Sequence, residues 1–123
     1  MLKLVITYHI VDVNKMVRLI MEITYFHPDI KSFISSFDGE TASDVLDAID
    51  FLSIKEYQLC MPYSKKIERD LYELRILGHH NIRVFYTFYE GRIILLHIIE
   101  KKTQKLKLQD LATARRRLRY LHS

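Results

Sequence analysis

The N-terminal half of the chain contains two stretches with helical spacing. In the first, four apolar residues stand at i, i+3, i+4 and i+7, which places them on one face of an α-helix. These residues are Ile30, Phe33, Ile34 and Phe37. The spacing predicts a helix over about residues 28–37, which Asp38 and Gly39 close.

The second helix is predicted to begin at Ser43, whose hydroxyl can accept hydrogen bonds from the free N–H groups of a first turn, and to end near Lys55. One face would be apolar and turned inward, and the other acidic and turned to water. The inward residues are Val45, Leu46, Ile49 and Leu52, and the outward residues are Asp44, Asp47 and Asp50.

The middle of the chain changes to the two-residue period of β-strands. Residues 71–77 alternate, with Tyr72, Leu74 and Ile76 on one face and Glu73 and Arg75 on the other. Residues 82–89 and 92–99 are rich in branched and aromatic side chains and predict two further strands. Short turns separate the three strands, which should form an antiparallel meander. Residues 61–70 are expected to be a connecting loop, because Pro62 and then a polar stretch interrupt the pattern.

A strand over residues 22–26 and a closing helix complete the predicted order. In the closing helix, apolar residues are three and four positions apart, and arginines cover the remaining surface. The apolar residues are Leu108, Leu111, Ala114, Leu118 and Leu121, and the arginines are Arg115, Arg116, Arg117 and Arg119. The order β-α-α-β-β-β-α predicts an α+β domain with an antiparallel sheet packed on helices.

The composition is that of one globular domain. A chain of 123 residues with 49% hydrophobic residues has enough apolar surface for a single core. Its one cysteine, Cys60, cannot form an internal disulfide and is expected to be buried as a small hydrophobe. No apolar run approaches the roughly 20 residues that cross a bilayer. Residues 2–13 are apolar, but they contain His9 and Asp12 and lack a cleavage site, so a cytoplasmic location is predicted.

Charge is divided unevenly along the chain. Residues 1–60 hold five Lys and Arg against nine Asp and Glu, and residues 61–123 hold fourteen against six, giving −4 and +8. A basic half suits a polyanion, because each cation placed near a phosphate releases a condensed counterion. A solvated basic face without a binding function would have the same composition.

Candidate chemistry gathers around the predicted sheet. Arg75 and Arg83 flank one short turn and can face each other, and Glu73 can pair with one of them. Three lysines follow the third strand of the meander: Lys101, Lys102 and Lys105. In a structural interpretation these groups are cross-strand ion pairs on an exposed face. In a functional one they hold an RNA phosphate and stabilise the charge that grows on its oxygens.

Histidines offer weaker signals. His79 and His80 lie at a turn and can exchange protons near neutral pH, although most turn histidines are merely solvated. His97 alternates with Ile and Leu and is expected to be packed. The chain has no His-x-x-x-His, no paired cysteines, no Gly-rich phosphate loop and no nucleophilic serine motif. Neither a metal nor a cofactor is therefore predicted.

Four segments occur in a specific order, spacing and structural context. They are residues 71–76 (LYELRI), 82–86 (IRVFY), 91–97 (GRIILLH) and 101–105 (KKTQK). Together they resemble the RelE/HigB-like toxins, particularly the phage-derived branch of that superfamily. Residues 61–67 (MPYSKKI) are similar to the loop that leads into the family's second strand, and residues 114–121 are similar to its closing helix.

The resemblance implies the toxin of a type II toxin–antitoxin system. Such a toxin is a ribosome-dependent endoribonuclease that cuts mRNA and is silenced by a helix-turn-helix antitoxin. The RNA's own 2′-hydroxyl attacks the adjacent phosphate, so the enzyme supplies cations and proton transfer and needs no metal. By position, the catalytic candidates are Arg75, Arg83 and Lys102, and the RNA-binding candidates are Glu73, Lys101, Lys105, His79 and His80.

The sequence also departs from the family pattern. Leu106 and Leu108 stand where members often carry a catalytic Tyr or His, so the resemblance leaves the general base unassigned. The toxin domain is predicted to be residues 21–123. Residues 1–20 have no counterpart in the family, and they are expected to be an added strand or a translated leader that the fold does not need.

The sequence is compatible with two functions. The first is the active ribonuclease, favoured by Arg75, Arg83 and Lys102. The second is a degenerate homologue that binds antitoxin or RNA without cutting, favoured by Glu73 and the missing Tyr or His. A DNA-binding repressor is disfavoured, because the acidic second helix would make a poor recognition helix.

Overall fold

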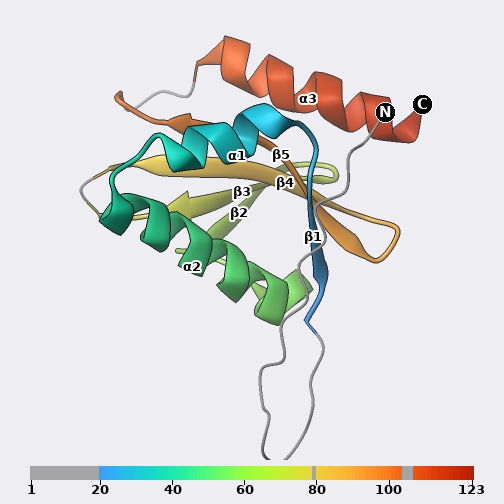
Figure 1. Cartoon of the computed structure of the whole chain (residues 1–123). Helices are drawn as coiled ribbons and strands as arrows, with labels where there is room; N and C mark the ends of the chain where they lie inside the picture. The colour runs from blue at the N-terminus through green and yellow to red at the C-terminus, as the bar shows by residue number, and fades with distance from the viewer. Residues whose placement is uncertain (1–19, 79, 104–106) are drawn as a thin grey trace, which may run out of the picture.

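The computed structural model describes residues 20–78, 80–103 and 107–123 (Figure 1). Its elements are β1 (Glu22–Tyr25), α1 (Pro28–Ser35), α2 (Gly39–Lys55), the 3-10 turn η1 (Glu56–Gln58), β2 (Ser64–Glu68), β3 (Leu71–Ile76), β4 (Ile82–Tyr89), β5 (Arg92–Glu100) and α3 (Leu108–His122). Ile20 is buried, and the N–H of Met21 donates to the carbonyl of Ser53 at 3.1 Å. The fold therefore includes Ile20, the last residue of the expected extension. Residues 1–19 lie outside the described part.

The described strands form one mixed sheet in the order β1-β5-β4-β3-β2, which confirms the α+β class. From β2 to β5 each strand is antiparallel to the next, which confirms the predicted meander for β3, β4 and β5. β1 instead runs parallel to β5, so the expectation of a wholly antiparallel sheet is wrong at this edge. The chain leaves β1 through two helices, a connection long enough to bring it back in either direction (Figure 1).

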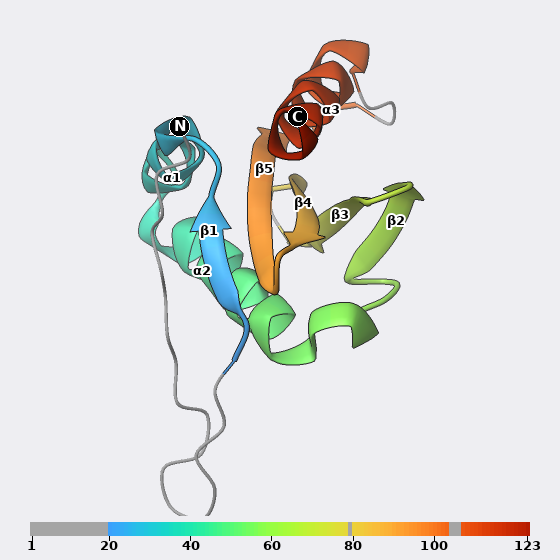
Figure 2. The same ribbon diagram turned by 90° about the vertical axis from the view of Figure 1, so that its right-hand side faces the viewer.

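Both faces of the sheet carry helices. α1 and α2 lie on one face, and α3 lies over β5 on the other (Figure 2). Side chains alternate between the faces along each strand, so β3 and β4 contribute to two cores. The first core includes Leu74, Val84 and Ile93, and the second includes Leu71, Phe85 and Ala114. None of the described helices combines the length and apolar character that crossing a membrane requires.

α2 begins four residues earlier than predicted. Asp38, which was expected to close the first helix, is the N-cap of the second, and its carboxylate accepts the backbone N–H of Thr41 at 2.8 Å. Hydrogen bonds from Thr41 hold the pKa of the Asp38 carboxyl below its usual value. Ser43 therefore lies inside α2 and does not cap it, because the helix already begins after Asp38. Leu46 is exposed rather than inward, since the buried stripe runs through Val45, Ile49 and Leu52.

The segment expected to be a loop contains a strand. β2 pairs with β3 at the outer edge of the sheet. Its sequence SKKIE is polar and lacks the alternation of apolar residues by which strands are predicted. Lysines on an edge strand discourage pairing with other chains, so an edge strand needs no apolar pattern. Cys60, just before β2, is exposed, and the expectation that it is buried is wrong.

A hydrogen bond between two buried hydroxyl groups ties the edge strand β2 to β4. The hydroxyls of Ser64 on β2 and Tyr86 on β4 form a short hydrogen bond that passes beneath β3. Burial raises the pKa of Tyr86 to about 12, so the phenol stays protonated. Both side chains are buried, so bulk water cannot easily replace either partner.

Tyr86→Phe should lower the free energy of unfolding by about 1–3 kcal/mol, because it leaves the buried Ser64 hydroxyl without its partner. Ser64→Ala should have a similar effect for the same reason. The double variant should lose less than the sum of the two, as each single change already breaks the bond. Urea denaturation of the four proteins measures this, and strictly additive losses would contradict the coupling.

Candidate active site

The β3–β4 hairpin brings the expected charged residues together. Arg75 and Arg83 are register partners, which confirms that they face each other across the hairpin. The Glu73 carboxylate accepts a hydrogen bond from Nε of Arg75 at 2.9 Å, and the same oxygen lies 3.7 Å from Nε of Arg83. Glu73 therefore stands between two guanidinium groups rather than pairing with one. We call these three residues the hairpin cluster.

The hairpin cluster is far less exposed than a surface ion pair. The side chains of Glu73, Arg83 and Arg75 are 8%, 10% and 23% exposed. The structural interpretation, an exposed sheet face, is therefore wrong about exposure but right about the ion pairs. Charges this buried are strongly coupled, because little water screens them.

Arg83 has donor capacity to spare. Its Nη1 donates to the Ile82 carbonyl at 3.2 Å, but its buried Nε has no hydrogen-bond partner among the described residues. Burial lowers the pKa of Arg83, and the Glu73 carboxylate opposes that shift. The guanidinium stays charged at any physiological pH. A buried guanidinium N–H that has an ion-pair neighbour but no hydrogen-bond partner is uncommon in proteins, and it suits a site that receives an anion.

A third cation, missed in the sequence, stands beside the cluster. Lys65 on β2 is the register partner of Glu73, so it shares the face of the hairpin cluster. It is exposed. The polar pattern of residues 61–70 did not indicate a strand, so Lys65 had no predicted face.

The lysines after β5 line a hollow of about 240 Å³ between that strand and the start of α3. Lys101 and Lys102 are joined there by Lys107, which the sequence did not single out. The lining also includes Ile99, the register partner of Arg83. The hollow therefore lies at the end of β5, one strand away from Arg83, and no residue of the hairpin cluster lines it. Lys105 lies outside the described residues.

His80 is not part of this surface. Its Nδ1 lies 2.6 Å from the Glu100 carboxylate, and its ring contacts Phe37, which packs on the core under α1 and α2. The structure therefore separates His80 from the hairpin cluster. His79 lies outside the described residues.

His97 lies on the face of the hairpin cluster, which the sequence did not indicate. It is the register partner of Phe85, and their rings stack at 6.3 Å. Its Nε2 lies 3.1 Å from Oδ1 of Asp110, in the first turn of α3. The expected packing is confirmed in part, since the side chain is 18% exposed. Asp110 belongs to α3, which is distant in sequence from the middle of β5, so no local pattern could predict its contact with His97.

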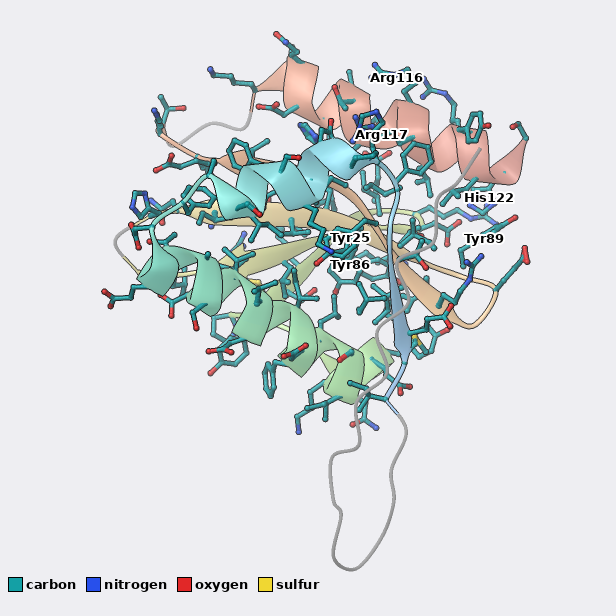
Figure 3. The ribbon with its side chains drawn as sticks, viewed as in Figure 1. Tyr25, Tyr86, Tyr89, Arg116, Arg117 and His122 are labelled. Carbon is teal, nitrogen blue, oxygen red and sulfur yellow. The ribbon has the colours of Figure 1, made fainter. Side chains whose placement is uncertain are left out.

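The arginines of α3 divide into two groups. Arg115 binds Glu68 of β2 at 2.7 Å, and Arg117 binds Asp29 of α1 at 2.7 Å and donates to the Leu96 carbonyl (Figure 3). These two fasten the helix to the sheet and to α1. Arg116 and Arg119 are exposed and add to the basic surface.

The comparison with known families covers most of the described fold. Residues 32–119 match the family described as phage derived protein Gp49-like (DUF891). The matched span runs from α1 into α3 and contains the hairpin cluster, Lys65, His97 and the lysine hollow. No curated protein matches the chain at a significant level of similarity.

Removing both Arg75 and Arg83 should destabilise the fold more than the loss of two exposed side chains would, because their partner Glu73 is buried. The variant Arg75→Ala/Arg83→Ala leaves the Glu73 carboxylate buried without either guanidinium, which costs about 3–5 kcal/mol when a buried pair is broken. Adding Glu73→Leu removes the unpaired carboxylate and should recover most of the lost stability. Thermal unfolding of the double and triple variants tests this. A double variant as stable as the parent would show that the cluster's charges contribute nothing to the fold.

Proposed function

Because the chain belongs to the phage-derived Gp49-like protein family, we propose that it is a toxin of the RelE/HigB-like kind, a ribosome-dependent endoribonuclease that cuts mRNA. The observation that carries this proposal is the hairpin cluster. Two arginines stand opposite each other on one sheet face, and one has an unused buried donor. Two guanidinium groups at one point are well suited to a phosphodiester, because each offers a planar fork of N–H donors.

The surroundings fit a polyanion rather than a small acid. Lys65 lies on one side of the cluster, and on the β5 side lies a hollow lined by three lysines together with Glu100 and Asp110. These lysines are Lys101, Lys102 and Lys107. Together they can hold the phosphates on either side of a scissile bond.

In the proposed reaction the RNA provides its own nucleophile. The 2′-hydroxyl oxygen bonds to the adjacent phosphorus, the bond from phosphorus to the 5′-oxygen breaks, and a cyclic phosphate remains. Arg75 and Arg83 meet the charge that grows on the phosphoryl oxygens, and Lys102 holds the backbone beside it. Donors already aimed at developing charge lower the barrier without having to reorganise. No step requires a metal.

The partners proposed for this activity are the ribosome with its message and a helix-turn-helix antitoxin that silences the toxin. Both partners are found in the cytoplasm, and we propose that the protein acts there. The acidic α2 and the basic face of α3 lie on opposite sides of the sheet (Figure 2). RNA would therefore approach from the α3 side.

A second function is favoured by one specific contact. Glu73 already neutralises part of the charge on both arginines, at 2.9 Å and 3.7 Å. A catalytic site weakened in this way suits a degenerate toxin that binds antitoxin or RNA without cutting. The two functions differ in whether bound RNA is cleaved.

Induced expression of this chain alone should arrest bacterial growth, and co-expression of the reading frame beside its gene should restore it. Ribosome inactivation by message cleavage accounts for the arrest. Colony counts and pulse labelling of new protein measure it. Normal growth at confirmed expression would favour the binding function instead.

Arg75→Ala and Arg83→Ala should each slow cleavage of ribosome-bound message on the order of 10²- to 10³-fold, by analogy with loss of an oxyanion donor. Arg→Lys at either position should restore only part of the rate, since a point charge cannot make two parallel hydrogen bonds. Arg69→Ala, which removes the same charge from the exposed turn between β2 and β3, is the matched control and should cleave normally.

Primer extension on programmed ribosomes gives the rates, and circular dichroism verifies the fold. Treating the protein with EDTA, and removing the chelator before it meets programmed ribosomes, should leave the cleavage rate unchanged, because no step requires a metal on the protein. Parent-like cleavage by a folded Arg75→Ala/Arg83→Ala/Glu73→Leu variant would overturn the assignment of the site.

A further inference from the structure

The face of the hairpin cluster lacks an assigned group that could accept a proton from RNA. Four histidines fall in the described residues. His27 caps α1, His80 is held by Glu100, and His122 contacts Tyr89. Tyr89 and Arg83 stand six residues apart on β4, about 20 Å along a strand, so His122 belongs to the far end of the sheet (Figure 3). Among these four, only His97 lies on the face of Arg83 and close to it along the sheet.

A β-bulge turns His97 toward that face. Tyr86 pairs with Leu95 while Phe85 pairs with His97, so Leu96 is an extra residue on β5. Strict alternation from Leu95 would have put His97 on the α1 and α2 side. The bulge reverses this and leaves His97 and Phe85 on one side. Bulges re-aim side chains in this way and are frequent beside active sites.

The position of His97 relative to Arg83 fits one phosphodiester. Arg83 pairs with Ile99, so His97 is its diagonal neighbour on β5. Such neighbours lie roughly 7–8 Å apart in an antiparallel pair. This spacing separates the two strand positions, and side chains from positions this close can both reach one phosphate and its adjoining 2′-hydroxyl. His97 also lines a hollow of about 320 Å³ that shares Ile99, Glu100 and Asp110 with the lysine hollow.

Asp110 is positioned to orient the ring. Three carboxylates line the hollow of His97: Asp29, Glu100 and Asp110. Asp29 is held by Arg117 at 2.7 Å and Glu100 by His80 at 2.6 Å, whereas Asp110 contacts His97 at 3.1 Å. A carboxylate on one imidazole nitrogen fixes the tautomer, leaves the other nitrogen as acceptor, and stabilises the protonated ring.

We propose that His97 is the general base of this ribonuclease and that Asp110 is its positioning residue. The proposal rests on the proposed function. Nδ1 of His97 takes the proton of the 2′-hydroxyl as the 2′-oxygen bonds to phosphorus. The 5′-oxygen leaves and takes a proton from water, and the resulting hydroxide recovers the proton from the imidazolium. The products are a 2′,3′-cyclic phosphate and a 5′-hydroxyl, and His97 returns to its neutral form.

The competing explanation is structural: the His97–Asp110 bond fastens the start of α3 to β5. Both explanations expect some loss of stability when either residue changes. Only the catalytic one expects the missing imidazole to be replaceable by imidazole from solution, which the adjoining hollow can admit.

The test uses the full chain on ribosomes programmed with a defined end-labelled message. His97→Ala should lower the single-turnover rate on the order of 10²- to 10⁴-fold, as expected for loss of a general base. It should bind the same ribosomes as tightly as the parent. Added imidazole should restore much of the rate to His97→Ala and none to Arg83→Ala. Asp110→Asn should cause a smaller loss, and His122→Gln, the matched histidine control, should cleave normally.

His97→Gln, which keeps a polar side chain of similar size, guards against a variant that fails to fold. Parental cleavage by folded His97→Gln and His97→Ala would overturn the proposal while leaving the ribonuclease intact. A lost rate that imidazole does not restore, accompanied by a lower melting temperature, would assign the bond to structure and also overturn it. A parent chain that binds ribosomes and cuts nothing would overturn the proposed function itself.

Discussion

The register of the β3–β4 hairpin is the constraint on which the candidate site depends. It sets Arg75 directly opposite Arg83, and two like charges at that spacing repel unless a counter-charge lies between them. Glu73 supplies that charge from the same face of β3, at 2.9 Å and 3.7 Å from the two guanidinium groups. A slip of one residue would turn all of these side chains into the core under α1 and α2. The hairpin cluster and the hydrophobic core therefore specify the same register.

The sheet separates the two signs of charge in space. The acidic residues of α2 lie on one face, and the arginines of α3 lie on the other (Figure 2). Half of the α3 arginines are used within the fold, through Glu68 and Asp29. The net charge of the C-terminal half thus overstates the charge open to a ligand. The charge that remains open includes Arg116 and Arg119 on α3, Lys65 on β2 and the lysines after β5.

β5 connects the parts of the molecule that the proposed chemistry needs. It pairs with β1 on one side and β4 on the other, and it contacts α1 and α3. Its bulge shifts the face of every residue after Leu96. That single extra residue moves His97 beside Phe85 and within reach of Asp110. A change in β5 therefore affects the sheet core, the docking of α3 and the chemistry of the face that carries the hairpin cluster.

The sequence by itself determined the α+β class, the meander from β3 to β5, and the pairing of Arg75 with Arg83. These features follow from local periodicity and short turns, which act over a few neighbouring residues. Only the tertiary structure decided the parallel partner of β1, the edge strand that carries Lys65, and the burial of Glu73. It also decided the face of His97 and its contact with Asp110. Each of these depends on which distant segments come together, because an edge strand needs no apolar pattern and a bulge breaks the alternation from which a face is predicted.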